Sequence, residues 1–256
     1  MKVALLAGGL GTRLREETEF RPKPMVMVGG RPILWHIMRN YAHHGHKEFV
    51  VCAGYRGEII KEYFREFQSE VSDFTVTLGT KSSIEFHGNF VEEGWKVTVT
   101  NTGLTTMTGG RLFKARKYLG SDTFMCTYGD GLANVDLKSL LQFHKMHGKI
   151  ATVTAVRPVS RFGVMDISSK GLVENFREKP QADGWINAGF FIFNKEIFDY
   201  IDEDSVLENG PMASLAENNE LMAFHHEGFF QPMDTYREYN LLNHLWDLGN
   251  APWKVW

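Results

Sequence analysis

Cysteine is nearly absent from this chain of 256 residues, which contains only Cys52 and Cys126. Each lies inside an apolar run, so we expect buried thiols rather than a disulfide or a metal site. Free thiols are typical of a reducing compartment, and we therefore expect a cytoplasmic protein. The ten histidines are scattered, without the H-E-x-x-H pattern or the clustered spacing of metal ligands.

A surplus of basic charge and a long apolar run are also absent. The net charge is −3 at pH 7, which gives no basic footprint of the kind that nucleic-acid-binding proteins carry. No apolar run approaches the ~20 residues of a membrane-spanning helix. The first residues are typical of a strand rather than of a signal peptide. We therefore expect neither a nucleic acid nor a membrane as a partner.

Short apolar runs alternate with segments of helical spacing along most of the chain. Such alternation predicts an α/β, Rossmann-like fold, in which a mostly parallel central sheet has helices on both faces. Residues 74–78 and 95–100 alternate in strand fashion and predict a small β insertion, and a helical C-terminal part is expected after Asp199. The predicted strands of the sheet are 3–7, 49–53, 124–128 and 151–156, and the predicted helices are 33–43, 59–67 and 236–246.

The first predicted strand runs into a glycine-rich turn that is suited to binding phosphate. Gly8, Gly9 and Gly11 let a ligand approach the backbone, and successive N–H groups in such a loop form an anion-binding concavity. Arg13 and Lys23 add positive charges suited to phosphate oxygens. The loop is not a Walker A motif, because no lysine follows Gly11 at the required place. From the residues alone, a turn with two solvated basic side chains is the alternative.

Two aspartates stand where a metal ion could be held. Asp130 follows the predicted strand 124–128 and has a glycine on each side, at the strand end where open α/β sheets bind ligands. Mg²⁺ uses one or two carboxylates together with substrate phosphates and water. A simple turn is the alternative for Asp130. Asp234 precedes the predicted helix 236–246, and its alternative role is that of an N-cap.

Three ordered motifs resemble those of the sugar-phosphate nucleotidyltransferases. The first is G-G-x-G-T-R-L at residues 8–14 followed by K-P at 23–24, and the others are F-R-E-K-P at 176–180 and N-A-G at 187–189. The resemblance extends over essentially the whole chain and implies a single nucleotidyltransferase domain over residues 1–256. It also implies Mg²⁺ as the cofactor, with Asp130 and Asp234 as its ligands.

The resemblance implies roles for a larger set of residues. Catalysis is expected to depend on Arg13, Lys23 and Lys179. In the T-G-G segment at 108–110, small residues would let a base or ribose lie against the backbone, and a flexible loop is the alternative. The expected nucleotide contacts are Leu6, Ala7, Gly8, Gly9, Gly11, Thr12, Arg13, Lys23, Gly103, Thr108 and Gly109. The expected sugar-phosphate contacts are Tyr128, Gly163, Glu178, Lys179 and Asn187.

Within the family, the runs Q-P-M-D-T at 231–235 and A-P-W-K at 251–254 resemble members that use CTP and glucose 1-phosphate. This implies formation of CDP-glucose and pyrophosphate, for CDP-linked deoxysugar and O-antigen (lipopolysaccharide) precursors. Thymidylyl or uridylyl transfer to glucose 1-phosphate or another hexose 1-phosphate is the alternative. Two functions from other classes are also considered. A non-catalytic nucleotide sensor would not need to retain both aspartates, which this chain has. A glycosyltransferase would be expected to carry a D-x-D metal motif at a strand end, and this chain has none there.

Exposed apolar residues predict assembly. The segment 74–95 and a tail rich in aromatics (Trp246, Trp253 and Trp256) indicate a surface that neighbouring subunits keep dry. The family resemblance implies a homo-oligomer, with a hexamer as the candidate form.

Overall fold

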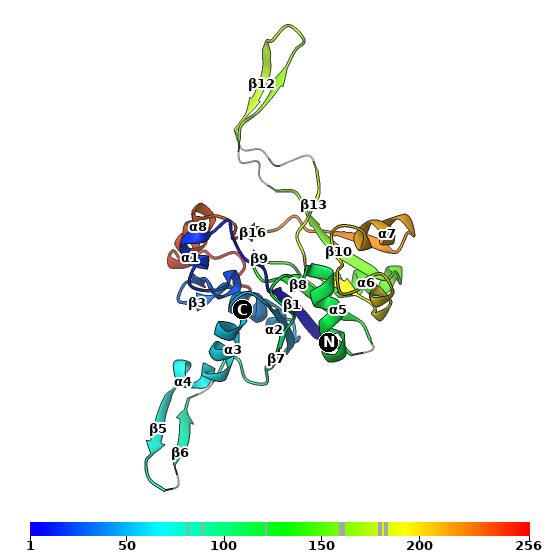
Figure 1. The fold of residues 1–256 in the computed structure, drawn as a ribbon. Coiled ribbons are helices and arrows are strands. Elements are labelled where there is room, and N and C mark those ends of the chain that lie inside the picture. The colour runs from blue at the N-terminus through cyan, green and yellow to red at the C-terminus, as the bar shows by residue number, and fades with distance from the viewer. Residues whose placement is uncertain (81, 89, 121, 159–161, 179–180, 182–183) are drawn as a thin grey trace.

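The computed structural model describes residues 1–256 except 81, 89, 121, 159–161, 179–180 and 182–183. Its body is built on one large central sheet (Figure 1). Across that sheet the strands follow the order β13 (Ile186–Asn187), β10 (Ala151–Val156), β14 (Phe191–Phe193), β8 (Phe124–Tyr128), β1 (Lys2–Ala7), β4 (Glu48–Ala53) and β7 (Lys96–Asn101).

The central sheet is mostly parallel, as predicted. β1 pairs in parallel with β4 and with β8, and β4 pairs in parallel with β7. β14 is antiparallel to both β8 and β10, and β10 pairs in parallel with β15 (Leu221–His225). β14 therefore separates two parallel parts of the sheet, and the short edge strand β13 pairs with β10 in antiparallel fashion.

Helices cover both faces of the sheet, so β1 is buried on both sides. Val3 and Leu5 face one core, whereas Ala4 and Leu6 face the other. Complete burial of a side chain such as Leu5 stabilises the fold by about 2 kcal/mol. The first core contains residues of α2 (Ile33–His43), α3 (Gly57–Arg65), α6 (Leu137–His147) and α8 (Tyr236–Asp247). The second contains residues of α5 (Thr108–Leu119), the 3₁₀ helix η2 (Lys195–Asp199) and α7 (Pro211–Glu217).

The predicted β insertion is present, but its boundaries differ. The strand expected over 95–100 is β7 of the central sheet, and the insertion is a hairpin of β5 (Asp73–Thr77) and β6 (Ser83–His87). β6 was not predicted, although Ile84 and Phe86 alternate with polar side chains over its five residues, which are mostly exposed. The helix expected over 59–67 ends at Arg65, and a separate short helix, α4 (Phe67–Val71), follows it.

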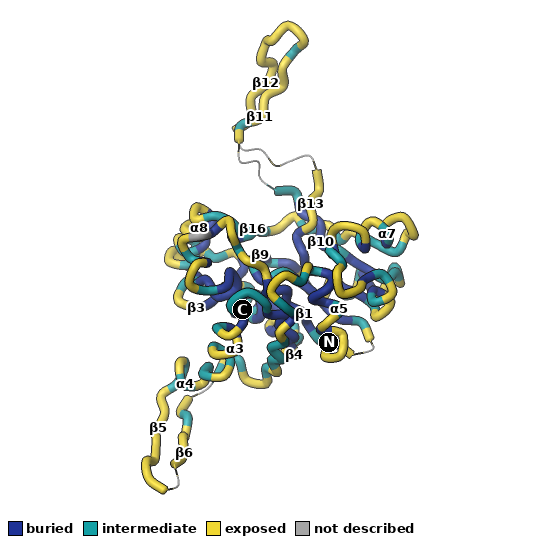
Figure 2. The backbone as a smooth tube through the Cα atoms, in the orientation of Figure 1, coloured by how far each residue is buried: buried dark blue, intermediate teal, exposed yellow. Residues whose placement is uncertain are grey.

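Two hairpins extend from the body of the molecule (Figures 1 and 2). One is β5–β6, and the other consists of β11 (Val164–Ile167) and β12 (Val173–Arg177). Nearly all of their residues are exposed, and within the described chain each strand pairs only with its hairpin partner.

Short elements complete the body and position the site. The predicted helical C-terminal part is present as α7 and α8, with two strands between them. The short elements are α1 (Arg15–Thr18), the 3₁₀ helix η1 (Lys23–Met25), β2 (Met27–Val28), β3 (Arg31–Pro32), β9 (Gly131–Ala133) and β16 (Phe230–Pro232). Among the helices of the described residues, none combines the length and apolar character that a membrane span requires.

The aromatic tail does not form the exposed surface that was predicted. Trp253 is completely buried, and Trp246 and Trp256 pack against the same core. All three rings surround His36 of α2. The aromatic side chains of the tail are therefore covered by residues of their own chain. The two cysteines are buried free thiols, as expected, and burial raises the pKa of Cys52 to about 12.

Candidate functional site

The glycine-rich loop and the two aspartates meet at the carboxyl ends of the central strands. The loop follows β1, Asp130 follows β8, and Asp234 lies between β16 and α8. β16 pairs with β9, and the Met233 N–H donates to the Asp130 carbonyl at 2.9 Å. This pairing brings Asp234 beside Asp130, although the two are far apart in the sequence.

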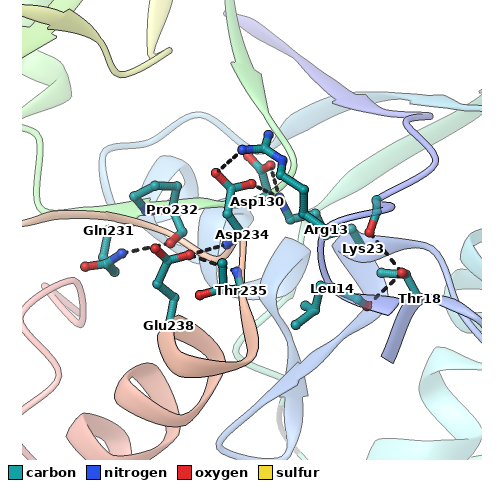
Figure 3. Close-up of polar contacts among 11 residues, drawn as sticks. Arg13, Leu14, Thr18, Lys23, Asp130, Gln231, Pro232, Asp234, Thr235 and Glu238 are labelled. Carbon is teal, nitrogen blue, oxygen red and sulfur yellow. Dashed lines mark hydrogen bonds and ion pairs between the residues drawn. The ribbon is translucent and has the colours of Figure 1, made fainter. Parts of the chain in front are cut away.

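Lys23 connects the two aspartates (Figure 3). Its Nζ donates to Asp130 Oδ2 at 2.7 Å and to Asp234 Oδ1 at 2.6 Å. Burial acts to lower the pKa of Lys23, but the two carboxylates outweigh it, and the pKa is raised. Arg13, whose side chain is 73% exposed, donates from Nη1 to Asp234 Oδ2 at 3.0 Å. These four side chains form one cluster, called here the ionic cluster.

The Asp234 carboxylate does not cap α8. The N-cap is Thr235, which forms a capping box with Glu238. Glu238 Oε2 accepts the backbone N–H of Asp234 at 2.7 Å and that of Thr235 at 2.9 Å. Figure 3 shows the Asp234 side chain directed toward Lys23 and Arg13 instead. The N-cap alternative is therefore wrong, and the carboxylate belongs to the ionic cluster.

Thr18 holds the glycine-rich loop in shape. Its hydroxyl has a single proton, which is shared between the carbonyls of Leu14 at 2.7 Å and Gly11 at 2.9 Å. Gly11 has a φ of 63°, and a Cβ there would lie 2.9 Å from the Thr18 methyl group. Both the backbone conformation and the close contact therefore favour glycine at this position.

A cleft of about 330 Å³ opens beside the loop, a volume within the range of small-molecule sites. Many of the predicted nucleotide, sugar-phosphate and metal contacts line this cleft: Leu6, Ala7, Gly8, Gly9, Gly11, Thr12, Arg13, Lys23, Thr108, Tyr128 and Asp130. The lining residues that were not expected are Pro24, Thr106, Met107, Arg111 and Gly129. The fold thus gathers most of the expected nucleotide contacts, whose roles stay predictions.

Arg111 is a buried residue of this cleft that sequence reasoning missed. Its guanidinium donates to the carbonyl of Gly8 at 2.9 Å, to that of Gly103 at 2.8 Å and to the Thr102 hydroxyl at 2.8 Å. A Cβ on Gly8 would lie 2.0 Å from Arg111 Nη1. Arg111 therefore joins the loop to the segment before α5, and its place directly after T-G-G was the available signal.

The T-G-G segment packs against the chain between η2 and α7. Thr108 lines the cleft, but Gly109 does not, and a Cβ on Gly109 would lie 2.8 Å from the Ser205 carbonyl. The Gly110 N–H donates to that same carbonyl at 2.9 Å. Packing therefore explains the small residue at 109 without a ligand. Gly103 also lies outside the cleft lining, and its carbonyl accepts from Arg111.

Tyr128 and Asn187 are brought together from β8 and β13. Asn187 Nδ2 donates to the Tyr128 hydroxyl at 3.1 Å. The Tyr128 hydroxyl in turn donates to Glu208, which also accepts from the Thr108 hydroxyl. Glu208 was missed because it lies in an irregular segment and belongs to no motif that the sequence displays.

The other sugar-phosphate candidates are not brought to the cleft. Gly163 and Glu178 lie beside each other at the base of the β11–β12 hairpin, and neither lines the cleft. Figure 1 shows this hairpin extending away from the body. Its strands are exposed, and no other element of the described residues packs against them. The expectation that these two residues join Tyr128 and Asn187 is therefore not met within one chain. Lys179 lies outside the described residues.

A phosphate-type loop and an ionic cluster at the end of an α/β sheet define a nucleotide-handling protein. Residues 2–235 match the family model described as nucleotidyl transferase, and the chain belongs to the nucleotidyl transferase family. It is 51% identical to a glucose-1-phosphate cytidylyltransferase of Salmonella typhi, over the full length of both chains. It is 42% identical to a probable glucose-1-phosphate cytidylyltransferase of Bacillus subtilis (strain 168), again over both full lengths.

The fold is also shared with solved structures. The crystal structure of apo UDP-glucose pyrophosphorylase matches with a TM-score of 0.71 over 97% of this chain and 98% of that chain. The sequence identity is 15%, so this likeness concerns the fold alone. The predicted α/β nucleotidyltransferase fold is confirmed.

Proposed function

We propose that the protein transfers a cytidylyl group from CTP to α-D-glucose 1-phosphate and releases CDP-glucose and pyrophosphate. The observation that carries this is the ionic cluster beside the glycine-rich loop, in a chain similar over its whole length to a glucose-1-phosphate cytidylyltransferase. The product would serve CDP-linked deoxysugar and O-antigen precursor synthesis. The buried free thiols support a cytoplasmic location for the enzyme.

The proposed reaction needs no protein nucleophile. An oxygen of the sugar phosphate, already an anion, attacks the α-phosphorus of CTP in line. The bond from that phosphorus to the bridging oxygen breaks, and pyrophosphate leaves with the bonding electrons. Catalysis then depends on positioning and on neutralising the charge of the phosphates.

Each cation of the site has a place in this scheme. Backbone N–H groups of the loop and the exposed Arg13 would hold the β- and γ-phosphates. Lys23, whose raised pKa keeps it protonated, would stabilise charge at the α-phosphate. Lys179 is proposed to hold the attacking phosphate, on the strength of the F-R-E-K-P motif.

Asp130 and Asp234 fit a magnesium ion. Each places a carboxylate oxygen within 2.7 Å of the same Lys23 nitrogen, so two hard donors converge on one cationic centre. Among the described residues no group of three or more His, Cys, Asp or Glu side chains could hold a metal. A pair suffices for Mg²⁺, which takes its other ligands from phosphates and water. When bound, the ion would neutralise charge on the triphosphate.

A homo-oligomer, with a hexamer as the candidate form, is part of the proposal. It is supported by the exposed apolar side chains of the two hairpins, since large exposed apolar patches mark contact surfaces. These side chains include Phe74, Leu78 and Ile84 on one hairpin and Val164, Met165, Ile167, Leu172 and Phe176 on the other.

The test is pyrophosphate release from each of the four nucleoside triphosphates against a panel of hexose 1-phosphates. We expect the highest kcat/KM with CTP and glucose 1-phosphate. A preference for dTTP or UTP would support the alternative transfer, and release with no pair would indicate a sensor. Consumption of a finished nucleotide sugar without pyrophosphate release would indicate a glycosyltransferase.

A further inference from the structure

Glu208 joins two parts of the cleft that come from distant segments of the chain. Its Oε2 accepts from the hydroxyl of Thr108, the first residue of α5, at 2.6 Å. Its Oε1 accepts from the hydroxyl of Tyr128, the last residue of β8, at 2.5 Å. Hydrogen bonds to an ionised acceptor are about twice as strong as neutral ones. One carboxylate therefore links the nucleotide side of the cleft to the sugar side.

The contact with Glu208 fixes the orientation of the Tyr128 hydroxyl. Because this hydroxyl donates its single proton to Glu208, it presents a lone pair to Asn187 Nδ2, which lies 3.1 Å away. Asn187 Oδ1 accepts the Gly189 N–H at 2.8 Å, so the Asn187 amide is held at both ends. A chain of directed hydrogen bonds thus runs from Glu208 to Gly189.

Glu208 itself is anchored on the side of α5. The Thr108 hydroxyl that donates to Glu208 also accepts the Leu207 N–H at 2.9 Å. A carboxylate at the N-terminus of a helix is favoured by the helix dipole. If the Glu208 carboxylate were removed, Thr108 would keep its bond to Leu207, whereas Tyr128 would lose the group to which it donates. The loss would therefore fall on the sugar side of the cleft.

From this arrangement we infer that Glu208 is a positioning residue for the sugar-phosphate acceptor, and that it acts through Tyr128. The inference rests on the proposed function, in which Tyr128 and Asn187 contact the sugar phosphate. Glu208 sets the direction of the Tyr128 hydroxyl and, through it, of the Asn187 amide. The carboxylate transfers no proton and touches no reacting atom.

The test is a KM comparison for two substitutions of Glu208. Glu208→Ala is expected to raise KM for glucose 1-phosphate about tenfold and to leave KM for CTP within about twofold. Glu208→Gln keeps one oxygen acceptor and is expected to raise KM for glucose 1-phosphate only about threefold. The matched control is Glu203→Ala, on the same segment. Glu203 is exposed, and in the described structure its carboxylate bonds to neither Thr108 nor Tyr128.

A double-mutant cycle with Tyr128→Phe tests whether Glu208 acts through Tyr128. In the Tyr128→Phe protein, Glu208→Ala is expected to change KM for glucose 1-phosphate by less than about twofold, because coupled residues are not additive. Three results would overturn the inference. The first is that the two substitutions have additive effects, and the second is that KM for CTP rises instead of KM for glucose 1-phosphate. The third is a lower melting temperature with both KM values unchanged.

Binding of CDP-glucose, measured by titration calorimetry, separates this inference from the proposed function. It needs no turnover, and Glu208→Ala is expected to weaken it about tenfold while Glu203→Ala leaves it unchanged. If the wild type binds CDP-glucose and Glu208→Ala weakens that binding, but no pyrophosphate is released, the proposed reaction fails and the positioning role stands. Normal wild-type turnover with unaltered binding and KM in Glu208→Ala overturns the positioning role alone.

Discussion

The cleft and the β11–β12 hairpin carry two parts of one predicted site, yet they are built in opposite ways. In the cleft, Lys23 lies in the buried 3₁₀ helix η1 and Asp130 follows the buried strand β8, and their side chains meet within 2.7 Å. In the hairpin, all residues of both strands are exposed, and neither Gly163 nor Glu178 lines the cleft. Core packing positions the first part. Within the described residues, the strands of the second part pack against no core.

Lys23→Ala should have the largest effect, because it removes the centre of the ionic cluster. We expect kcat to fall about 10³-fold, the loss typical of one electrostatic group that faces developing charge. The substitution also leaves two carboxylates facing each other without their shared cation. Pyrophosphate release measures kcat, and urea denaturation checks the fold. Lys61→Ala, at an exposed position of α3, is the control and should change neither quantity.

Arg13→Ala should have a smaller effect on the same reaction. Its side chain is 73% exposed and has little part in packing, so the melting temperature should stay unchanged. We expect kcat/KM for CTP to fall about 10²-fold, through lost contacts with phosphate. Wild-type kinetics in this variant would contradict the phosphate role of the loop.

Leu172→Lys tests whether the β11–β12 hairpin contacts other copies of the chain. Leu172 is 67% exposed near the tip of the hairpin, so the substitution should leave the stability of the body unchanged. If the hairpins contact other copies, the dissociation constant of the oligomer should rise at least about tenfold. Sedimentation across a concentration series measures it. Met146→Lys, at a 78% exposed position of α6, is the control, and a wild-type monomer at micromolar concentration would contradict the assembly.

A further prediction concerns the body alone and depends on pH. His36 is held neutral, because its Nε2 donates to the Val28 carbonyl at 2.8 Å while its Nδ1 accepts from Trp253 Nε1 at 3.3 Å. Burial lowers the pKa of His36 from 6.5 to about 4. Above pH 6.5 neither state is protonated, so His36 adds no pH dependence there.

As the pH falls from 6.5 toward 4, the unfolded chain takes up a proton that the folded chain does not, so folding becomes less favourable. The free energy of unfolding should fall by about 3 kcal/mol across this window. Urea denaturation between pH 7 and pH 4 measures it. His36→Gln should remove this part of the pH dependence, and an unchanged slope would assign it to other groups.

The sequence predicted those parts of the site that lie beside buried strands. The apolar runs 3–7 and 124–128 fix where their carboxyl ends lie, so Gly8 and Asp130 could be placed together. Glu208 could not be found in this way, because an irregular segment carries no period that locates its side chains. The aromatic tail was misjudged because composition alone does not reveal whether Trp253 is covered by its own chain or by another.

The residues of the T-G-G segment show a second limit. Small side chains at 108–110 fit a bound nucleotide and a close contact between segments equally well, and the sequence does not distinguish the two. The structure places the Ser205 carbonyl against Gly109, a contact between residues far apart in the chain. Such contacts depend on how the whole fold closes, which local patterns do not specify.

The central claim is that Asp234 serves the cleft while its neighbour Thr235 serves the helix, and a paired substitution tests it directly. Asp234→Asn keeps the backbone and removes the charge, so turnover should fall by about 10²–10³-fold and the Mg²⁺ requirement should rise, with little change in melting temperature. Thr235→Ala should do the reverse, lowering stability by about 1 kcal/mol through loss of the cap. Its Mg²⁺ dependence should stay normal. Thermal melting and a Mg²⁺ titration of pyrophosphate release, run on both variants, give the answer. Near-normal turnover of Asp234→Asn at ordinary Mg²⁺ would contradict the account.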